Sequence, residues 1–356
     1  MLSSVNKVIT IVIPAYNVER YIGQCLESLV RQTCKRFCAI VVDDGSTDGG
    51  TARIAQEYAA SHSGLIYYIC QENKGLGAAR NTGLARVKTP FVTFLDSDDW
   101  LDVRYIETVV AALEKYDDDS IDIALTLPTI YDSITSQMWD WNDADLFRWI
   151  FTPEHPIVDA ASDMRLFDLE PSACRRVCRT AFLKQNNIRF PEGTRWEDVL
   201  PHFQMFTCAK RCLGIAEVGF FYRINVPTSI TATGSRSRLE VASAFRSVFD
   251  YLTQTGASAP VFNSAARMLV HFSMWSISLS RQGVRSDLIK ALHALYTSLP
   301  KHIFKNVLPS LSRKERLFVK VIRSRMLHPL LVDYLPESAA KILFDKLRAV
   351  KRKLHL

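Results

Sequence analysis

The chain has 356 residues, of which 48% are hydrophobic and 23% are charged, and this composition is typical of a soluble globular protein. The sequence is too hydrophobic to be disordered and has too little Gly and Pro to be low-complexity. At about 150 residues per domain, its length predicts two domains, or one large domain with an appendage. Residues 313–356 carry a formal charge of +8 and the rest −1, so a body that binds nucleic acid through a broad basic field is disfavoured.

The first hundred residues alternate strand-like and helix-like segments. Apolar, β-branched runs predict the strands, and apolar residues at helical spacing predict the helices between them. In chain order, we expect strands at 8–14, 39–42, 65–70 and 90–95, and helices at 21–32, 49–61, 75–86 and 101–116. This order predicts a parallel sheet covered by helices. From about residue 240 the pattern is helical, over 240–255, 261–281, 285–298, 313–327 and 337–353.

The eight cysteines include two Cys-x₃-Cys pairs, Cys174 with Cys178 and Cys208 with Cys212. This spacing is compatible with a zinc site, but each pair lies in a half-apolar run that we interpret as helical, and buried core thiols are the commoner case. No signal peptide opens the sequence, and no apolar run approaches the roughly 20 residues of a spanning helix. We therefore expect a cytoplasmic protein with reduced thiols.

Each of the four predicted strands ends in a polar cluster. Open parallel sheets bind ligands beyond the carboxyl ends of their strands, so these clusters predict one shared site. In chain order they are Pro14-Ala15-Tyr16-Asn17, Asp43-Asp44-Gly45-Ser46, Asn73-Lys74-Gly75-Leu76-Gly77-Ala78-Ala79-Arg80-Asn81 and Asp96-Ser97-Asp98-Asp99.

Together these motifs resemble those of family 2 glycosyltransferases, inverting enzymes of the GT-A fold that use nucleotide-sugars. The resemblance is dense over residues 5–115, returns over 190–198 and 222–231, and fades after about residue 240. It implies an α/β protein with a Rossmann-like GT-A catalytic domain at 1–235, followed by a mostly helical C-terminal region with a basic tail at 236–356. The catalytic domain would have a nucleotide-binding half at 1–115 and an acceptor-side half at 116–235.

Asp96 and Asp98 form a D-x-D pattern after the fourth predicted strand. A nucleoside diphosphate is a strongly negative leaving group, and a divalent cation held by carboxylates can bridge it to the protein. Solvated loop acids are the alternative, but the apolar run before the pattern and Trp100 after it favour a metal site. By resemblance, Asp98 binds Mn²⁺ or Mg²⁺, and Asp96 contacts the cation, the ribose or the sugar, with Ser97 in the same donor site.

Asp43 and Asp44 are candidates for binding the base of the nucleotide. A carboxylate at this edge can accept the imide N–H of uracil, and capping of the following helix is the alternative role. The resemblance implies a uracil base and a pocket that Pro14, Ala15 and Tyr16 also line. Tyr16 is then placed to stack on the base, although a half-buried structural tyrosine is also compatible with the sequence.

The third cluster contains two glycines, which permit close backbone approach, at the start of a helix, where anions are favoured. It lacks the G-x-G-x-x-G spacing of dinucleotide sites and the spacing of a P-loop. By resemblance, Asn73, Gly77 and Arg80 contact the base and diphosphate. Further along the chain, Arg175 and Arg176 lie where related enzymes carry a basic residue near the diphosphate or acceptor, and Arg223 and Ser229 lie in the segment that folds over the nucleotide. Surface charge is the alternative for the arginines.

Glu197 and Asp198 are the catalytic candidates. Inversion at an anomeric carbon needs one carboxylate that takes the proton of the acceptor hydroxyl. By resemblance that base is Asp198, with Glu197 orienting it or binding the acceptor. The alternative is an acidic pair at the start of a helix over 197–209, where negative side chains are favoured.

We therefore expect a metal-dependent hexosyltransferase that moves a sugar from a nucleotide-diphosphate sugar, UDP-linked by resemblance, to a hydroxyl of a glycan or lipid-linked glycan in cell-surface polysaccharide assembly. One alternative is a nucleotidyltransferase of similar fold, which residues 15–19 disfavour because they lack a Gly-rich basic loop. The other is a non-catalytic subunit that binds a glycan or a nucleotide.

The basic tail is a candidate contact for the membrane. Leu343, Leu347, Val350 and Leu354 form an apolar stripe at helical spacing, surrounded by basic residues. This pattern predicts peripheral binding of residues 313–356 to an anionic membrane surface, at the inner face of the cell membrane. A helix docked on the body, with its charges in solvent, is the alternative.

Overall fold

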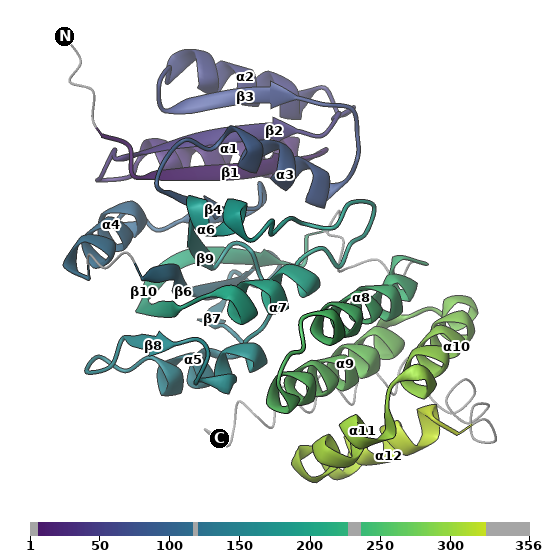
Figure 1. Cartoon of the computed structure of the whole chain (residues 1–356). Coiled ribbons are helices and arrows are strands. Elements are labelled where there is room, and N and C mark those ends of the chain that lie inside the picture. Colours follow the sequence, from purple (N-terminus) through teal and green to yellow (C-terminus); the bar gives the residue numbers. More distant parts are fainter. Residues whose placement is uncertain (1–5, 117–119, 227–235, 325–356) are drawn as a thin grey trace. The chain divides into compact units, whose positions relative to one another are not determined.

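The computed structural model describes residues 6–116, 120–226 and 236–324. The chain divides into two compact units, Met1–Ser229 and Ile230–Leu356. The division falls within residues 227–235, which lie outside the described residues, so the domain boundary at residue 235 stays a prediction. Each unit is therefore described by itself (Figure 1).

The first unit is built on a ten-stranded sheet with the path β3-β2-β1-β4-β9-β6-β10-β5. Its first part contains β1 (Ile9–Ala15), β2 (Phe37–Asp43), β3 (Ile66–Cys70) and β4 (Phe91–Phe94). These four strands pair in parallel, with β1 between β2 and β4. The predicted parallel sheet is confirmed, with each strand end within two residues of its expected position.

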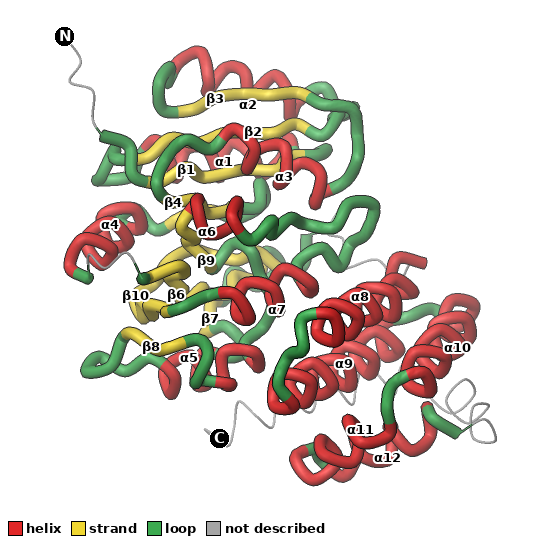
Figure 2. Tube along the Cα trace, viewed as in Figure 1, coloured by secondary structure: helices red, strands yellow, loops and turns green. Residues whose placement is uncertain are grey.

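Helices α1 (Glu19–Val30), α2 (Gly50–Ser61) and α3 (Leu76–Arg86) connect these strands (Figure 2). Every residue of β1 is buried, as expected for a strand that is covered on both faces. Helix α3 packs on β1 and β2, and α2 packs on β3. This packing fixes the carboxyl ends of the strands, where the predicted site lies.

The second part of the sheet is mixed. Antiparallel β9 (Arg176–Arg179) lies between β4 and β6 (Ile121–Asp132), and β10 (Arg211–Ile224) runs parallel to β6. The remaining elements are β5 (Trp100–Leu101), α4 (Tyr105–Lys115), β7 (Met138–Asp140), α5 (Ala144–Ile150), β8 (Ile157–Asp159), α6 (Thr180–Gln185) and α7 (Val199–Cys208).

The helical interpretation of the two Cys-x₃-Cys pairs is wrong. Cys178 lies in β9 and Cys212 in β10, while Cys208 ends α7. Short buried strands and helix segments cannot be told apart by apolar periodicity alone, which explains the error. Burial of Cys174, Cys178 and Cys212 confirms the expectation of core thiols for these three, and none of the eight cysteines, which all lie among the described residues, forms a disulfide.

The second unit is helical over its described residues. It contains α8 (Glu240–Gln254), α9 (Ala259–Leu279), α10 (Gln282–Ser298), α11 (Lys301–Val307) and α12 (Arg313–Ile322), and α9 contacts each of the other four. The helices expected at 240–255, 261–281 and 285–298 are confirmed, whereas α11 was not predicted. The helix expected at 337–353 lies outside the described residues.

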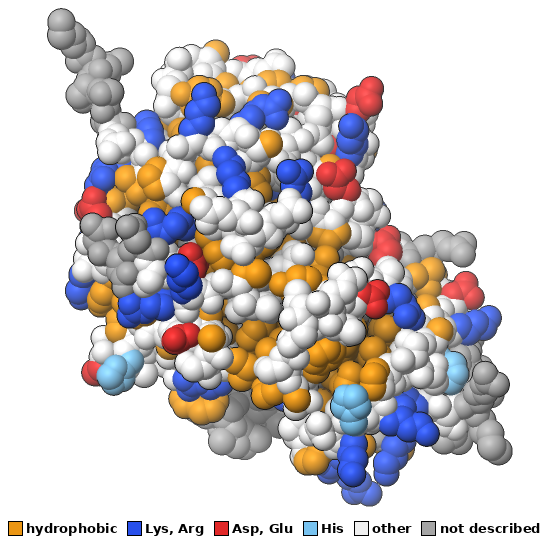
Figure 3. Space-filling model, in the orientation of Figure 1, with side chains coloured by type: hydrophobic (Ala, Val, Ile, Leu, Met, Phe, Trp, Pro, Cys, Tyr) orange, Lys and Arg blue, Asp and Glu red, His pale blue; other side chains and the backbone are white. Residues whose placement is uncertain are grey.

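Lys and Arg side chains gather over α11 and α12 on the face that Figure 3 shows. Residues 281–324 contain ten Lys and Arg and two acidic residues. In the part of the chain that the structure describes, no helix combines the length and apolarity needed to cross a bilayer.

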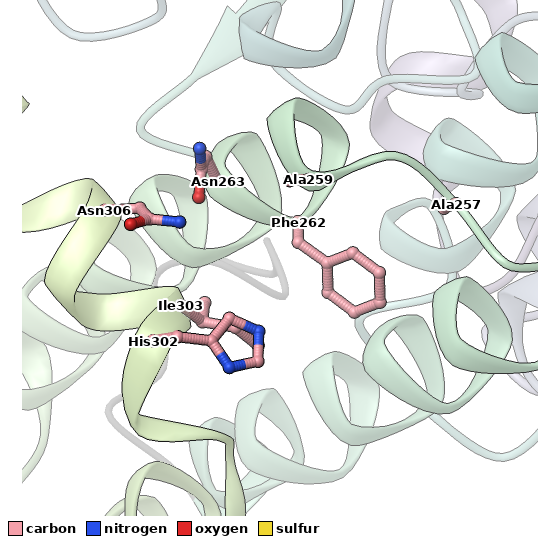
Figure 4. A pocket seen from close by; sticks show the side chains of 7 residues that line it. All are labelled: Ala257, Ala259, Phe262, Asn263, His302, Ile303 and Asn306. Carbon is pink, nitrogen blue, oxygen red and sulfur yellow. The ribbon is translucent and has the colours of Figure 1, made fainter.

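The helical unit also has a small pocket of about 190 Å³ beside α9 and α11. The rings of Phe262 and His302 point into it, and Asn263 and Asn306 line it (Figure 4). Pockets for drug-sized ligands span about 300–1,000 Å³, so this one is too small for a nucleotide-sugar.

Candidate functional site

The polar clusters predicted at the carboxyl ends of the strands lie side by side at one edge of the sheet. Ala15 at the end of β1 is in register with Asp43 at the end of β2, and the Asp44 N–H donates to the Ala15 carbonyl at 2.8 Å. Pro14 and Ala15 are buried, whereas Tyr16 is 48% exposed. The predicted pocket residues are therefore neighbours, and the exposed Tyr16 ring is available to a ligand.

Both oxygens of Asp43 have partners within the fold. Oδ1 accepts from the Ser46 N–H at 2.9 Å, and Oδ2 accepts from the Tyr68 hydroxyl at 2.8 Å. Neither Asp43 nor Asp44 caps α2, because Asp48 instead accepts from the Thr51 N–H and hydroxyl. The capping alternative is therefore wrong for both aspartates.

Asp44 ties the end of β2 to the loop after β3. Its Oδ1 accepts from the Gln71 amide at 2.7 Å and the Lys74 N–H at 2.9 Å, and its Oδ2 accepts from the Gly75 N–H at 2.7 Å. Asn73 is exposed within the loop that Asp44 holds. Asp44 thus shapes the loop in which Asn73 is presented, a role that its sequence position did not reveal.

Arg80, on α3, joins three carboxylates from distant parts of the chain. Nη1 donates to Glu197 Oε1 at 2.9 Å and to Asp198 Oδ1 at 2.7 Å, and Nη2 donates to Asp96 Oδ1 at 2.8 Å. The guanidinium also lies over the Phe190 ring, 5.3 Å from its centroid. One buried cation therefore brings the D-x-D segment and the Glu197-Asp198 pair together.

Arg80 was predicted to contact the diphosphate, and this geometry does not support that contact. Its side chain is only 1% exposed, and its described partners are the three carboxylates and an aromatic ring. The reason lies in the tertiary fold: the 190–198 segment covers α3, which the local sequence around Arg80 does not indicate.

Gly77 has a packing role that differs from the predicted one. A Cβ at this position would lie 2.2 Å from the Pro191 carbonyl oxygen and 3.5 Å from the Glu197 Cβ. The missing side chain therefore allows the 190–198 segment to approach α3. Close approach was the correct physical reason for this glycine, but the approaching group is the protein's own backbone.

The Asp96–Asp99 turn follows β4, and the Asp99 N–H donates to the Asp96 carbonyl at 3.0 Å. Ser97 is buried, while Asp98 is half-buried and its carboxylate accepts no hydrogen bond from another described residue. Burial, followed by the negative charge of Asp96, raises the pKa of Asp98 to about 6. The nearby positive charge of Arg223 lowers this pKa but offsets the burial only in part.

Arg223 supports this turn from β10. Its N–H donates to Asp99 Oδ1 at 2.7 Å, its Nε donates to the Asp98 carbonyl at 2.7 Å, and its Nη2 donates to Gln24 at 2.7 Å. The guanidinium lies over the Trp100 ring, 4.6 Å from the centroid. The structure thus places Arg223 beside the predicted metal site, although its polar contacts fix the backbone of that site.

Arg175 and Ser229 are not brought to this cluster. The Arg175 side chain is fully buried, pairs with Asp143 at 2.6 Å and lies over the Phe147 ring. This buried pair gives Arg175 a structural partner, so its predicted contact with a diphosphate or acceptor has no support in this geometry. Ser229 lies outside the described residues.

Asp198 precedes α7 and is held by two donors. Oδ1 accepts from Arg80, and Oδ2 accepts from the Ala173 N–H at 3.2 Å. Asp198 stands at the N-terminus of α7, as the helix-start alternative predicted, but its side chain makes no capping hydrogen bond. The Ala173 contact could not be predicted from the sequence, because backbone N–H groups carry no residue-type signal.

Glu197 is more deeply buried than Asp198. Its Oε1 accepts from Arg80, and its Oε2 has no hydrogen-bond partner. Burial, followed by the negative charge of Asp198, raises the pKa of Glu197 to about 7. Such a cluster of carboxylates around one arginine resembles functional sites more than structural ion pairs.

A divalent cation fits the chemistry at Asp96 and Asp98, because the Asp98 carboxylate is a hard oxygen ligand of the type that Mn²⁺ and Mg²⁺ prefer. Among the described residues, no group of three or more His, Cys, Asp or Glu is arranged to hold a metal ion. A cation here would therefore need further oxygen ligands from a bound diphosphate or water.

Comparisons with known proteins indicate a family for the first part of the chain. Residues 10–171 match the family "Glycosyl transferase family 2". Glycosyltransferase GlyA of Streptococcus pneumoniae is 45% identical over 111 residues, which cover 31% of this chain and 16% of the relative. The poly(ribitol-phosphate) beta-N-acetylglucosaminyltransferase TarS of Staphylococcus aureus is 27% identical over 216 residues, which cover 60% of this chain and 35% of TarS.

Solved structures show the same fold. TarS 1–349 in complex with UDP has a TM-score of 0.67 at 23% identity, with 89% of this chain and 87% of that chain covered. A mannosyltransferase of Pyrobaculum calidifontis in complex with GDP-Man and Mn²⁺ has a TM-score of 0.51 at 17% identity, with 96% of this chain and 89% of that chain covered.

The chain spans less than two fifths of the length of the two curated relatives named above. Over residues 10–171, this chain is therefore similar to glycosyl transferase family 2.

Proposed function

We propose that this protein is an inverting glycosyltransferase that moves a sugar from a UDP-sugar to a hydroxyl of a glycan or lipid-linked glycan during cell-surface polysaccharide assembly. The observation that carries this proposal is the Arg80 bridge between Asp96, at the end of β4, and Asp198, before α7. It brings a candidate donor-binding carboxylate and a candidate base into one cluster, as a direct displacement at the anomeric carbon requires.

In the proposed mechanism, Asp198 takes the proton of the acceptor hydroxyl as that oxygen attacks the anomeric carbon. Arg80 and the Ala173 N–H fix the direction of the Asp198 carboxylate. Glu197, bonded to the same arginine, supports that arrangement. Asp98, with Asp96, would hold Mn²⁺ or Mg²⁺, which when bound offsets the charge of the diphosphate leaving group.

The related proteins support the choice of donor and pathway. TarS is described as acting on poly(ribitol-phosphate), and its structures include complexes with UDP and UDP-GlcNAc. A further relative, which is 32% identical over 200 residues, is a teichoic acid poly(glycerol phosphate) polymerase of Staphylococcus epidermidis. UDP-linked hexoses and N-acetylhexosamines are therefore the first donors to test.

We further propose that the enzyme acts at the inner face of the cell membrane as a peripheral protein. The described part of the candidate contact is α12, whose outward residues Arg313, Lys314, Arg316 and Lys320 surround the 62% exposed Leu317. Basic residues around an exposed apolar side chain favour an anionic lipid surface. The apolar stripe at 343–354 lies outside the described residues.

The first test is Asp198→Asn, assayed with a panel of UDP-sugars and Mn²⁺. Without the base, transfer should fall by about 10²–10⁴-fold, while UDP binding measured by thermal shift stays close to that of the wild type. Asp145→Asn is the control, because the Asp145 side chain is 96% exposed and should tolerate the change. Near-wild-type turnover by Asp198→Asn would refute the assignment of the base.

The same assay separates the alternatives. A transferase releases a nucleoside diphosphate from the donor, a nucleotidyltransferase forms or consumes pyrophosphate, and a binding subunit does neither. Omission of Mn²⁺ and addition of a chelator test the proposed metal dependence, which predicts loss of transfer and recovery when Mn²⁺ or Mg²⁺ is restored.

A further inference from the structure

The first unit contains a buried arginine that has no carboxylate hydrogen-bond partner among the described residues. The Arg176 side chain extends from β9 and is almost completely buried. Its Nη1 donates to the Ser172 carbonyl at 2.9 Å, its Nη2 contacts His202 Nδ1 at 2.7 Å, and its guanidinium lies over the Phe206 ring. A buried cation without a paired carboxylate is costly, although the negative charges of Asp198 and Asp143 act on it from further away.

His202 has a defined protonation state in this pair. An arginine can only donate, so Nδ1 must be the acceptor, and Nε2–H donates to the Phe167 carbonyl at 3.2 Å. Burial, and then the Arg176 charge, lowers the pKa of His202 well below its ordinary value. The ring is therefore neutral and fixed at both nitrogens.

These contacts form a closed ring that includes Asp198. The His202 N–H donates to the Asp198 carbonyl at 3.1 Å within the first turn of α7. On the other side, Arg176 holds Ser172, and the next residue, Ala173, donates its N–H to Asp198 Oδ2 at 3.2 Å. The Arg176 backbone is itself fixed in the sheet, since its carbonyl accepts from Thr93 at 2.9 Å.

We infer that the Arg176–His202 pair is a positioning device for Asp198: it links the loop before β9 to α7, so that the Ala173 N–H stays on the Asp198 carboxylate. This inference rests on the proposed function, because it gives the pair a purpose only if Asp198 reacts. Arg176 and His202 contact no substrate in this role, and they act through the loop and the helix.

The test compares three variants of the full-length protein. His202→Leu removes the acceptor for Arg176. His202→Asn should restore it, because the Asn Oδ1 occupies a position equivalent to Nδ1. Arg176→Lys keeps the charge and most of the volume, but its single ammonium cannot serve both Ser172 and His202. This variant remains informative if His202→Leu does not fold.

His62→Leu is the control. The half-buried His62 ring hydrogen-bonds to the Tyr58 carbonyl and stacks on the Tyr58 ring.

Two measurements are made on each folded variant. Amide hydrogen exchange resolved at Ala173 should be faster in His202→Leu and Arg176→Lys than in the wild type, and should return toward the wild-type rate in His202→Asn. In the transfer assay, kcat should fall by about 10–100-fold in the two disruptive variants with the donor KM unchanged, since small misplacement of a reacting group has effects of this size.

A general loss of packing would instead raise the donor KM or speed exchange throughout the unit, and this result would overturn the inference. It is also overturned if Ala173 exchange and kcat match those of the wild type, or if exchange rises at Ala173 while kcat does not fall. Absence of transfer by the wild type with every donor would refute the proposed function, whereas the exchange measurement would still report whether the pair holds the loop.

Discussion

At the scale of single residues, the central feature is Arg80, one buried cation shared by three carboxylates. With Asp96, Glu197 and Asp198 ionised, the four side chains carry a net charge of −2. Arginine suits this position because its planar guanidinium offers several donors in a fixed geometry, which a lysine ammonium does not. The arrangement therefore depends on the identity of this residue and not only on its charge.

Arg80→Lys tests that dependence. The charge is kept, but a single ammonium cannot bridge Asp96 and Asp198 in the same directions, so transfer should fall by about 100-fold or more. Arg80→Met should in addition destabilise the fold by about 3–5 kcal/mol, because it leaves the buried Glu197 carboxylate and the half-buried Asp96 and Asp198 carboxylates without a counter-charge. Steady-state kinetics and urea unfolding measure the two effects, and wild-type kinetics in Arg80→Lys would contradict the bridging role.

Glu197 predicts a defined pH dependence of stability. Its pKa of about 7 in the folded protein is above its ordinary value of 4.5, so between these values the folded state binds more protons than the unfolded state. This group therefore lowers the free energy of unfolding as the pH rises from about 5 to 8. Glu197→Gln removes this dependence, so it should gain stability relative to the wild type at pH 8 compared with pH 5.

Urea unfolding of both proteins at the two pH values measures this difference, and the comparison cancels the titration of groups that the two proteins share. An equal stability difference at pH 5 and pH 8 would show that Glu197 is not protonated preferentially in the folded state.

At the scale of elements, the site depends on the contact between α3 and the 190–198 segment. Gly77 allows the Pro191 carbonyl to approach the helix, and Asn81 fixes the segment by donating to the Phe190 carbonyl at 2.8 Å and accepting from its N–H at 3.0 Å. Through this contact, α3 positions the chain that leads to Glu197 and Asp198.

Gly77→Ala should displace that segment. The added Cβ would meet the Pro191 carbonyl at 2.2 Å, a distance that forces backbone movement, so the protein should lose about 1–3 kcal/mol of stability and about 100-fold in transfer. Gly23→Ala is the matched control, because nothing lies within 4 Å of a Cβ there and a mid-helix alanine should stabilise α1 by about 0.5–1 kcal/mol. Equal behaviour of the two variants would contradict the packing role of Gly77.

At the scale of the whole molecule, the excess of positive charge lies in the second unit. Residues 281–324 alone carry a formal charge of +8, more than the +7 of the complete chain. The excess of basic residues thus begins before residue 313, the start that the sequence pattern had predicted. The proposed role of this charge is to locate the enzyme rather than to bind the diphosphate.

Replacement of Arg313, Lys314, Arg316 and Lys320 by Gln should weaken binding to vesicles that contain anionic lipid by about 1 kcal/mol per residue, while transfer to a soluble acceptor is unchanged. The control replaces four exposed basic residues of the first unit that each pair with an acid, Arg31, Arg53, Arg104 and Arg148. Co-sedimentation measures both proteins. Unchanged binding of the α12 variant, or an equal loss in the control, would refute a specific contact through α12.

Much of the first unit's frame could be predicted from the sequence. Apolar runs and helical spacing predicted β1 to β4 and α1 to α3 within two residues, because these elements are continuous in the chain and buried in a regular pattern. The order of the strand-end clusters likewise predicted a shared edge. The mixed half of the sheet was not predictable, since β9 and β10 gain their pairing from strands that are remote in sequence.

For the site, the sequence by itself determined which residue types lie at the edge of the sheet: the carboxylates after β2 and β4, the glycine-containing loop before α3, and the acidic pair before α7. Only the tertiary structure decided what each of them contacts. Arg80 contacts Asp198 across 118 positions of the chain, and the Ala173 N–H reaches the same carboxylate from the backbone. Local patterns record which groups a segment offers, whereas their partners depend on long-range packing, and that packing gives Arg80 and Arg175, two predicted ligand contacts, carboxylate partners within the protein.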